Sequence, residues 1–249
     1  MLELAAASIT FVFTTVLTIA GVGAAFILIP VFDAMGYGIR EAMAVALLLN
    51  SIAMVFASVR FARKGLIEFR TAIPILIVAT VLSPVGAYTA QMVPEVPLRW
   101  MFVGFLLFAA VMMLFYHAKA REAHRASIWS LVITGGWVGA LAGFIGGLLG
   151  VGGGNIIVPV LVWLGFNPKR ASGTTAFIVI FSSFSGFLGH ATLGAINWIL
   201  LGAAAVGSVG GALLGAYLMT DRMNRSQVKL AIGVVLLFIA AHMIWKLVR

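Results

Sequence analysis

Residues 134–155 read TGGWVGALAGFIGGLLGVGGGN and lie within a run of 43 residues, 126–168, that carries no formal charge. As one helix, this run would be roughly 64 Å long, about twice the hydrocarbon core of a bilayer. It must therefore turn back, cross twice or break inside the membrane. The segment Gly150-Val-Gly-Gly-Gly154, closed by Asn155 and followed by Pro159, predicts where the helix breaks. Irregular backbone at membrane depth is tolerated only where protein buries it or where it lines a wet cavity, so this break is a candidate functional site.

The composition indicates an all-α polytopic membrane protein. Of 249 residues, 63% are hydrophobic and only 9% are charged, whereas about 25% are charged in a soluble domain. Cysteine is absent, which excludes disulfides, thiolate metal sites and cysteine nucleophiles. The net charge of +9 does not indicate nucleic acid, because the basic residues lie in short segments between apolar runs. Glu3, with no Lys or Arg, precedes the first apolar stretch, so we expect that stretch to be retained rather than cleaved as a signal peptide.

Uncharged runs divide the chain into eight segments. They are approximately 4–32, 42–59, 71–94, 100–116, 126–168, 171–189, 191–220 and 230–245. The first and the fifth are too long for one crossing, and both contain a glycine break followed by proline. We therefore expect about ten membrane segments, with each of these two runs doubled either as a re-entrant hairpin or as two crossings.

The chain also repeats itself. Pairing each residue with the one 129 positions later, without a gap, aligns Gly21-Val-Gly23 with Gly150-Val-Gly152 and Pro30 with Pro159. Residues 21–110 and 150–239 share sixteen identities in ninety positions, roughly twice what such a biased composition gives by chance. A register that aligns Gly and Pro together indicates a duplication.

Charge predicts how the two halves face. If every run crosses once, nine Lys and Arg residues lie on one side and seven on the other, a difference too small to predict the orientation in the membrane. If the two long runs each reverse direction, one side holds only Arg40, Arg99, Lys246 and Arg249. The other side then holds twelve: Arg60, Arg63, Lys64, Arg70, Lys119, Arg121, Arg125, Lys169, Arg170, Arg222, Arg225 and Lys229. The side that is richer in Lys and Arg is typically the cytoplasmic one. The termini belong to the other side, so both are predicted to lie outside the cell (inner or plasma) membrane.

If both long runs reverse direction, the two halves of the chain enter the membrane from opposite sides, so one half is inverted relative to the other. We expect two inverted repeats of about five membrane segments each, at 1–118 and 128–249, joined by a cytoplasmic linker at 119–127. Each repeat contains a Gly-rich broken or re-entrant segment. Inverted repeats with broken helices recur in secondary transporters, which bind substrate near the midplane at the repeat interface.

The glycines have two predicted roles. Those that recur every fourth residue form helix-packing faces; they are Gly135, Gly139, Gly143 and Gly147, and Gly207, Gly211 and Gly215. The glycines of 150–154 break that period. Their unhindered N–H groups lead into the stretch 155–164 and can form a helix N-terminus open to an anion.

Three segments of the second half resemble the sulfite exporter TauE/SafE family, also called the 4-toluene sulfonate uptake permeases. They are GGLLGVGGGNIIVPVLVWLG at 146–165, ASGTTA at 171–176 and HATLGAINW at 190–198. The resemblance covers nearly the whole chain as two copies. It implies an inner-membrane transporter of sulfur-containing or organic anions such as sulfite or sulfonates. The first copy departs from the family pattern, since it reads Gly23-Ala-Ala-Phe26 where glycines are expected.

The candidate substrate site joins the second break to polar residues of two other runs. We expect an anion pocket at mid-depth, formed by backbone N–H groups of 152–155 and the hydroxyls of Thr174 and Thr175. Aligned amide dipoles hold an anion reversibly at less cost than a buried charge. The hydroxyls of 172–175 could instead cap a helix, and Asn50 could instead join two helices. The full set is Gly150, Gly152, Gly153, Gly154, Asn155, Ser172, Gly173, Thr174, Thr175 and Asn50.

Other function classes stay open from the sequence. Few carboxylates lie within the apolar runs, which favours an exporter or facilitator over an ion-coupled importer of an organosulfur compound. An intramembrane serine protease built on Ser185 and His190 is a distant alternative, because residues five apart lie on poorly matched helix faces. A passive scaffold would leave the broken repeats unexplained. His190 and Tyr217 are expected near membrane edges.

The expected partners are a small anionic substrate and the lipid bilayer, without nucleic acid, and a homodimer is compatible with the sequence. Neither an H-E-x-x-H zinc motif nor a P-loop is present, so we expect no cofactor, metal or catalytic residue.

Overall fold

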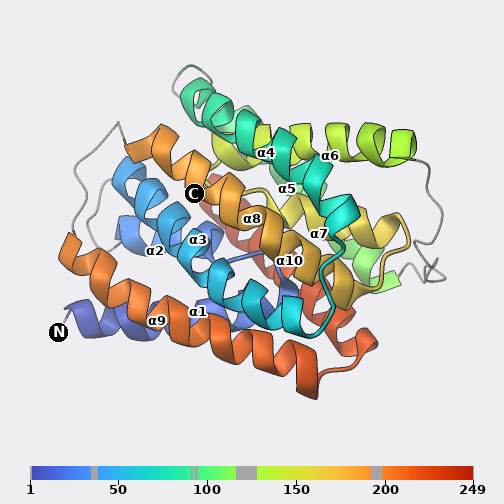
Figure 1. Cartoon of the computed structure of the whole chain (residues 1–249). Helices are drawn as coiled ribbons and strands as arrows, with labels where there is room; N and C mark the ends of the chain where they lie inside the picture. Colours follow the sequence, from blue (N-terminus) through green and yellow to red (C-terminus); the bar gives the residue numbers. More distant parts are fainter. Residues whose placement is uncertain are drawn as a thin grey trace.

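The computed structural model describes residues 2–34, 39–90, 92, 95–115, 128–191 and 198–248, and these residues are almost entirely helical. In chain order the helices are α1 (Leu2–Ala20), α2 (Ala25–Ala34), α3 (Ile39–Arg63), α4 (Phe69–Thr89), α5 (Glu95–Phe115), α6 (Ile128–Leu148), α7 (Gly154–Trp163), α8 (Pro168–Ala191), α9 (Trp198–Tyr217), the π-helical turn η1 (Leu218–Arg222) and α10 (Arg225–Val248) (Figure 1). Within this part of the chain, four stretches are long and apolar enough to cross a membrane: Glu41–Arg63, Phe69–Thr89, Pro168–His190 and Leu201–Arg222. The predicted all-helical membrane protein is thus confirmed for the described residues.

Both of the longest apolar runs break at the predicted glycines. The first break, residues 21–24, separates α1 from α2, and the second break, residues 149–153, separates α6 from α7. Gly21 and Gly23 have φ of 72° and 78°, and their counterparts Gly150 and Gly152 have φ of 69° and 72°, a conformation that only glycine adopts readily. The helices α2 and α7 have ten residues each. At roughly 15 Å they reach across about half of a bilayer core.

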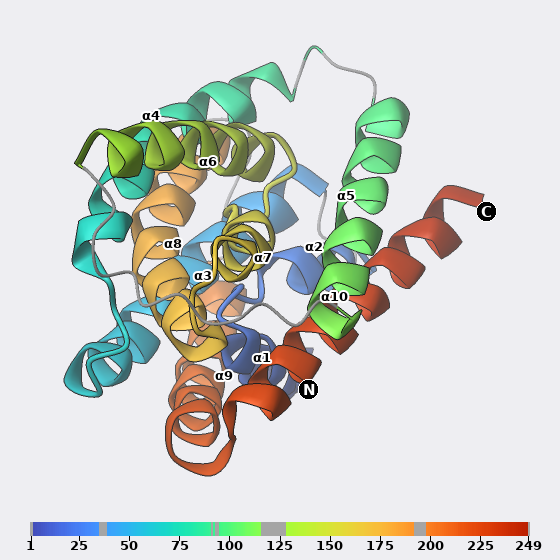
Figure 2. The ribbon, with the colours of Figure 1, turned by 90° about the vertical axis from the view of Figure 1, so that its right-hand side faces the viewer.

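The helices α3 and α8 pack against each other in the middle of the bundle, with the pair α4 and α6 on one side and the pair α1 and α9 on the other (Figures 1 and 2). The helices α5 and α10 pair with each other. In α3 and α8, 67% of the apolar span is buried, against 33% in α4. The uncharged polar side chains of Asn50 and Ser51 on α3 and of Ser182 and Ser183 on α8 therefore lie inside the protein, whereas only a third of the α4 span is buried.

Glycines bring two helix pairs close together. A Cβ added to Gly139 or Gly143 of α6 would lie 2.7 Å from the Ile75 carbonyl oxygen or 2.5 Å from that of Ala79, both on α4. On the other side of the bundle, Gly211 of α9 faces the Phe11 carbonyl oxygen of α1 in the same way. The prediction that these glycines form packing faces is confirmed.

Contacts recur with the offset of the sequence repeat. Gly86 faces the Phe144 carbonyl oxygen, and the counterpart of that contact joins Gly215 to the Thr15 carbonyl oxygen, with both members shifted by 129 positions. The Ser51 hydroxyl donates to the carbonyl oxygen of its own counterpart, Ile180, at 2.9 Å. The duplication read from the sequence is therefore also a duplication of packing.

Charged residues gather at one end of the bundle, which we call the basic end and define by Arg60, Lys64, Lys169, Arg170 and Arg222. Arg60 and Lys64, at the end of α3, pair with Asp221 of η1, and Arg170, at the start of α8, pairs with Glu68. Lys64 and Arg170 thus share an end, as the charge count with two reversals requires. Arg121 lies outside the described residues.

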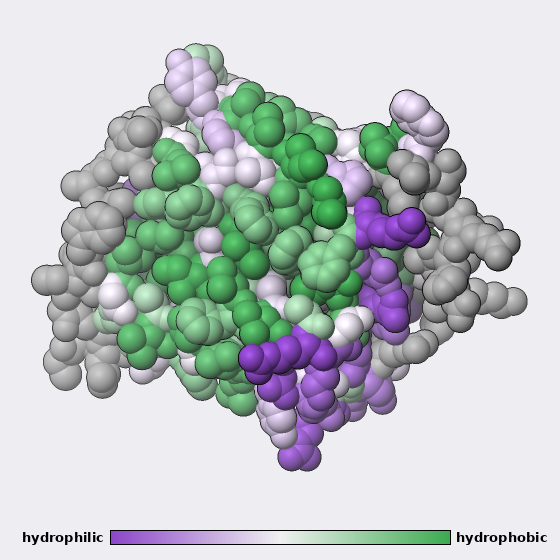
Figure 3. Space-filling view, viewed as in Figure 1, coloured by the Kyte–Doolittle hydropathy of each residue, from purple (hydrophilic) through white to green (hydrophobic). Residues whose placement is uncertain are grey.

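A broad hydrophobic band covers the visible surface beside that end (Figure 3). Large apolar side chains are exposed in it and elsewhere on the surface, among them Val81, Phe108 and Val206, with 64%, 66% and 75% of their surface accessible. A water-facing surface does not tolerate such extended apolar area, whereas lipid does.

Candidate functional site

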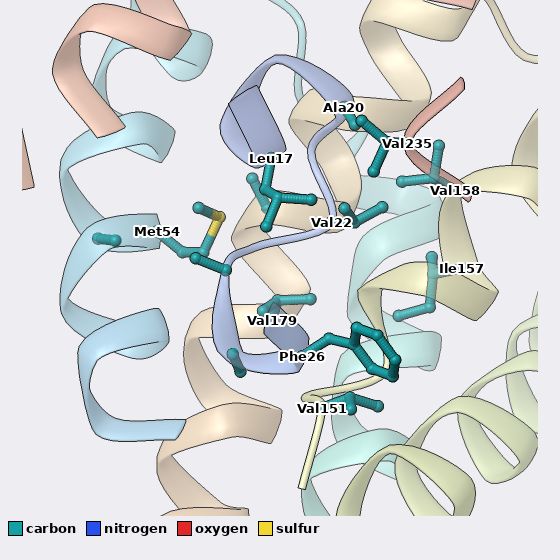
Figure 4. Packing of buried hydrophobic residues seen from close by; sticks show 14 of the residues in the cluster. Leu17, Ala20, Val22, Phe26, Met54, Val151, Ile157, Val158, Val179 and Val235 are labelled. Carbon is teal, nitrogen blue, oxygen red and sulfur yellow. The ribbon is translucent and has the colours of Figure 1, made fainter. Parts of the chain in front are cut away.

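The two breaks meet at the centre of the bundle. A Cβ on Gly154, at the start of α7, would collide with the carbonyl oxygen of Val22 in the first break. Figure 4 shows Val22 among buried apolar side chains, with Phe26 at the start of α2 directed toward Val151 of the second break. Because the two irregular segments touch, the breaks of the two repeats form a single region.

Asn50 of α3 ties this region together. Its Oδ1 accepts a hydrogen bond from the Ala24 backbone N–H at 2.8 Å, and its Nδ2 donates to the Ser183 hydroxyl of α8 at 2.9 Å. The Ser182 hydroxyl donates to the Gly152 carbonyl oxygen at 3.0 Å. All of these side chains are buried. Asn50 therefore joins helices, as one reading of the sequence favoured, and it also closes the first break, while its contact with a ligand stays a prediction.

The second break has no equivalent of this closure. The counterpart of Asn50 is Val179, which offers no polar atom to the backbone of the second break. Gly153 precedes α7 in the left-handed conformation, with φ of 77°. The first N–H groups of α7 have no acceptor within the helix, and they carry the positive end of its dipole. The start of α7 is therefore the more electropositive of the two breaks.

Asn155, in the first turn of α7, adds an uncompensated polar group. Its side chain is 1% exposed, and its Oδ1 has no hydrogen-bond partner among the described residues. The counterpart in the first repeat is Phe26, which is apolar. Buried polar atoms are nearly always hydrogen-bonded, so an unpartnered amide at a helix N-terminus indicates a place where a ligand can bind.

Three of the predicted residues on α8 have protein partners instead. The Thr174 hydroxyl accepts a hydrogen bond from the Glu68 backbone N–H at 3.0 Å, and Gly173 packs on the Leu66 carbonyl oxygen. The Ser172 hydroxyl donates to the Ala20 carbonyl oxygen at 3.0 Å, at the end of α1. Thr174 lies about 12 Å along α8 from Ser182, at 1.5 Å per residue. The structure therefore does not bring Thr174 to the second break, because the helical rise carries it toward the basic end.

Thr175 differs from its neighbours. Its side chain is fully buried, and its hydroxyl has no hydrogen-bond partner among the described residues. It lies about 10 Å along α8 from Ser182, between the second break and the basic end. Its predicted contact with substrate remains a prediction, at a separate point from the glycines.

Ser182 and Ser183 are not among the predicted site residues, yet their hydroxyls contact Gly152 of the second break. A signal for them was present. The interiors of the two central runs each contain adjacent polar residues, Asn50-Ser51 in one and Ser182-Ser183 in the other. Polar side chains at such depth pair across helices, so the two pairs could have been matched to each other.

The structure corrects the expectation for His190. Its side chain is 2% exposed, and its Nε2 lies 3.1 Å from the Gly147 carbonyl oxygen of α6. His190 ends the candidate span Pro168–His190, and the correction concerns its side chain, which packs inside the protein instead of lying at the surface. The Ser185 hydroxyl donates to the Thr80 carbonyl oxygen of α4 at 2.7 Å. Since Ser185 and His190 hydrogen-bond to different helices, they do not form the dyad that a serine protease requires.

The chain resembles known membrane transporters. The family model of the sulfite exporter TauE/SafE matches residues 6–243. A probable membrane transporter protein, YunE of Bacillus subtilis, is 29% identical over 182 residues, which are 66% of this chain and 66% of that protein. A probable membrane transporter protein of Xylella fastidiosa is 27% identical over 207 residues, 82% of this chain and 78% of the relative. Sulfite exporter TauE/SafE family protein 5 of Arabidopsis thaliana is 42% identical over 62 residues, 25% of this chain and 12% of that protein. No solved structure matches.

Proposed function

Because the chain belongs to the sulfite exporter TauE/SafE family and is a multi-pass membrane transporter, we propose that it moves small sulfur-containing or organic anions, such as sulfite or sulfonates, across the cell membrane. The observation that carries this proposal is the start of α7. There, backbone N–H groups and Asn155, whose buried Oδ1 has no hydrogen-bond partner among the described residues, lie at the centre of the bundle, where the two breaks meet.

An anion fits this site better than a cation. The start of a helix presents N–H donors and the positive end of the helix dipole, which attract negative charge. The residues of α7 include no Lys or Arg. A site made of neutral donors holds an anion without a full opposite charge, so release stays fast enough for transport. We place the substrate against the N–H groups of 153–155, because the Gly152 N–H already donates to the Gly146 carbonyl oxygen at 3.3 Å. The Asn155 Oδ1 then accepts from the hydroxyl of a protonated oxyanion, and Ser182 and Ser183 lie behind the glycines.

We further propose that the two repeats are inverted relative to each other and that the basic end faces the cytoplasm, with both termini outside. The contacts that recur with an offset of 129 and the gathering of Lys and Arg at one end support this arrangement. Single cysteines at Arg63 and Arg225 should then react with an impermeant reagent from the cytoplasmic side only. Labelling of the two positions from opposite sides would contradict it.

Export is the favoured direction. A singly charged anion that leaves a cell with a negative interior gains about 2.3 kcal/mol per 100 mV, so export needs no coupling ion. The alternative, an ion-coupled importer, would require a Na⁺ or proton gradient.

Flux into proteoliposomes tests the function. We expect uptake of at least one of sulfite, sulfate, thiosulfate and sulfoacetate, driven by membrane potential and unchanged by a Na⁺ gradient. Taurine has a sulfonate but no net charge. Its uptake would show that the protein recognises the sulfonate group, and its exclusion would show that a net negative charge is required. Absence of flux for every anion would overturn the proposal, and flux that depends on a Na⁺ or proton gradient would favour the importer.

A further inference from the structure

One carboxylate at the basic end is surrounded by cations. The Asp221 carboxylate in η1 lies 2.5 Å from the Nη2 of Arg60, on α3, and 2.6 Å from the Nζ of Lys64, which directly follows α3. The three side chains have 27%, 32% and 48% of their surface exposed, respectively. The contact is therefore open to water, and it joins the first repeat to the second.

Two more cations border the same carboxylate. The Lys169 Nζ, at the start of α8, donates to the carbonyl oxygen of Thr220, the residue before Asp221, at 3.1 Å. The Arg222 Nε donates to the Tyr217 hydroxyl at 3.1 Å, and the Arg60 guanidinium lies over the Tyr217 ring, 4.9 Å from its centre. Asp221 thus pairs with two cations, and two further cations, Lys169 and Arg222, bind groups close to it in the chain, so the cluster keeps an excess of positive charge that can attract another anion.

The repeat does not explain this cluster. The counterpart of Arg60 in the second repeat is Gly189, and the residue of the first repeat that corresponds to Asp221 is Met92. At these positions the opposite end of the bundle has no charge. The counterpart of Lys169 is Arg40, so part of the positive charge recurs, but the pair of Arg60 and Asp221 has no charged counterpart and is suited to a task that only one end performs.

We propose that Arg60, Lys64 and Lys169 form a receiving site for a small oxyanion at the basic end, and that Asp221 occupies this site as a tethered competitor. The inference rests on the proposed function and deepens it. An incoming sulfite or sulfonate carries the same negative oxygens as the carboxylate, and it replaces Asp221 without any covalent step. Substrate then loads from the basic end, which for a cytoplasmic basic end is the direction of export.

The exposure of the cluster favours exchange over a purely structural bridge. Ion pairs open to water contribute little to stability and are screened by salt, so a dissolved anion can compete with the carboxylate. The neighbouring pair of Arg170 and Glu68 joins the two repeats independently. Displacement of Asp221 therefore leaves the basic end held together.

Thermal-shift titration of the purified full-length protein tests the site, with sodium sulfite compared with sodium chloride at equal ionic strength. The titrations use the Asn155→Leu background, in which the central site is weakened. We expect Asp221→Asn to lower the half-saturating sulfite concentration about fivefold and Lys64→Gln to raise it about fivefold, the change that one exposed ion pair produces. Arg63→Gln, which removes the same charge one residue away, should change it less than about twofold.

The outcomes separate this inference from the proposed function. If sulfite stabilises the protein but Asp221→Asn and Lys64→Gln do not alter the titration, the receiving site is wrong and the transport function stands. An equal thermal shift with chloride would show that the ions only screen the charges of the cluster, and it would also overturn the receiving site. No response in any variant, together with no flux, would overturn both.

Discussion

The two breaks share their backbone and differ in what surrounds it. Both have left-handed glycines at equivalent positions, and in both the second residue donates to the carbonyl oxygen five positions earlier, Val22 to Leu17 and Val151 to Gly146. The first break is closed by Asn50, which accepts the Ala24 N–H. The second has a valine in the place of that asparagine. One backbone design is thus closed by the Asn50 side chain in the first repeat, whereas in the second repeat the counterpart side chain, Val179, has no polar atom to do so.

The comparison shows that glycines alone do not make a binding site. They let the chain turn, but the neighbouring side chains decide whether the freed N–H groups are already occupied. Asn155 opposite Phe26, and Gly153 opposite Ala24, are the substitutions that distinguish the second break from the first. Changing these residues should either erase the difference or show that it has no role in transport.

The largest effect is expected from Gly153→Val. This residue has φ of 77°, and a Cβ there would lie 2.5 Å from the Ala142 carbonyl oxygen. We expect loss of flux and destabilisation by about 3 kcal/mol or more, from left-handed strain plus overpacking. Ala24→Val, at the equivalent position without positive φ, should cost about 1–3 kcal/mol and retain flux. Flux in proteoliposomes and the melting temperature measure both effects. Equal loss at the two positions would favour a symmetric site, and normal flux in Gly153→Val would remove this glycine from the mechanism.

The second largest effect is expected from removing the Asn50 side chain that closes the first break. Asn50→Val leaves the Ala24 N–H and the Ser183 hydroxyl without their partner, which should cost about 1–3 kcal/mol of stability. Chemical denaturation in detergent measures the change. Ser51→Ala, which loses one hydrogen bond on the same helix, is the matched control and should cost about 1 kcal/mol. If Asn50→Val destabilised the protein no more than Ser51→Ala, the hydrogen bonds of Asn50 would not make the two breaks energetically different.

Asn155→Leu makes the second break as apolar as the first. Because the amide oxygen has no partner among the described residues, its removal should leave stability within about 1 kcal/mol of the wild type or raise it. Flux should nevertheless fall about tenfold, which corresponds to one lost hydrogen bond of about 1.4 kcal/mol from the hydroxyl of a protonated oxyanion such as hydrogensulfite to the Asn155 Oδ1. The concentration dependence of sulfite flux distinguishes weaker binding from loss of folded protein. A variant with normal flux would show that the amide does not meet the substrate.

The smallest effect is expected from Ser172→Ala. The hydroxyl donates to the Ala20 carbonyl oxygen, next to the first break, so its loss should cost about 0.5–1.5 kcal/mol. Flux should stay within about twofold, because the contact lies on the sealed break. A strong loss of flux with unchanged melting temperature would place Ser172 in the substrate path after all.

The sequence by itself determined the membrane class, the positions of the helix breaks and the repeat. Each follows from local physics: apolar runs of a given length must lie in lipid, and only glycine adopts the left-handed turns found at Gly150 and Gly152. Charge favoured a reversal in each long run, and the end shared by Lys64 and Arg170 agrees with the reversal of the run 126–168 that lies between them. The glycines at every fourth residue likewise predicted close packing without any knowledge of their partners.

Only the tertiary structure decided which polar groups meet. Thr174 and Thr175 follow the second break by about twenty residues, and spacing along the chain says nothing about their distance from it in space. The rise of α8 carries Thr174 to Glu68 and brings Ser182 and Ser183 to the glycines instead. Asn50 reaches a break in its own repeat and a serine in the other because α3 and α8 cross at the centre. A hydrogen bond depends on positions within a few tenths of an ångström, which the packing of helices sets and local sequence does not.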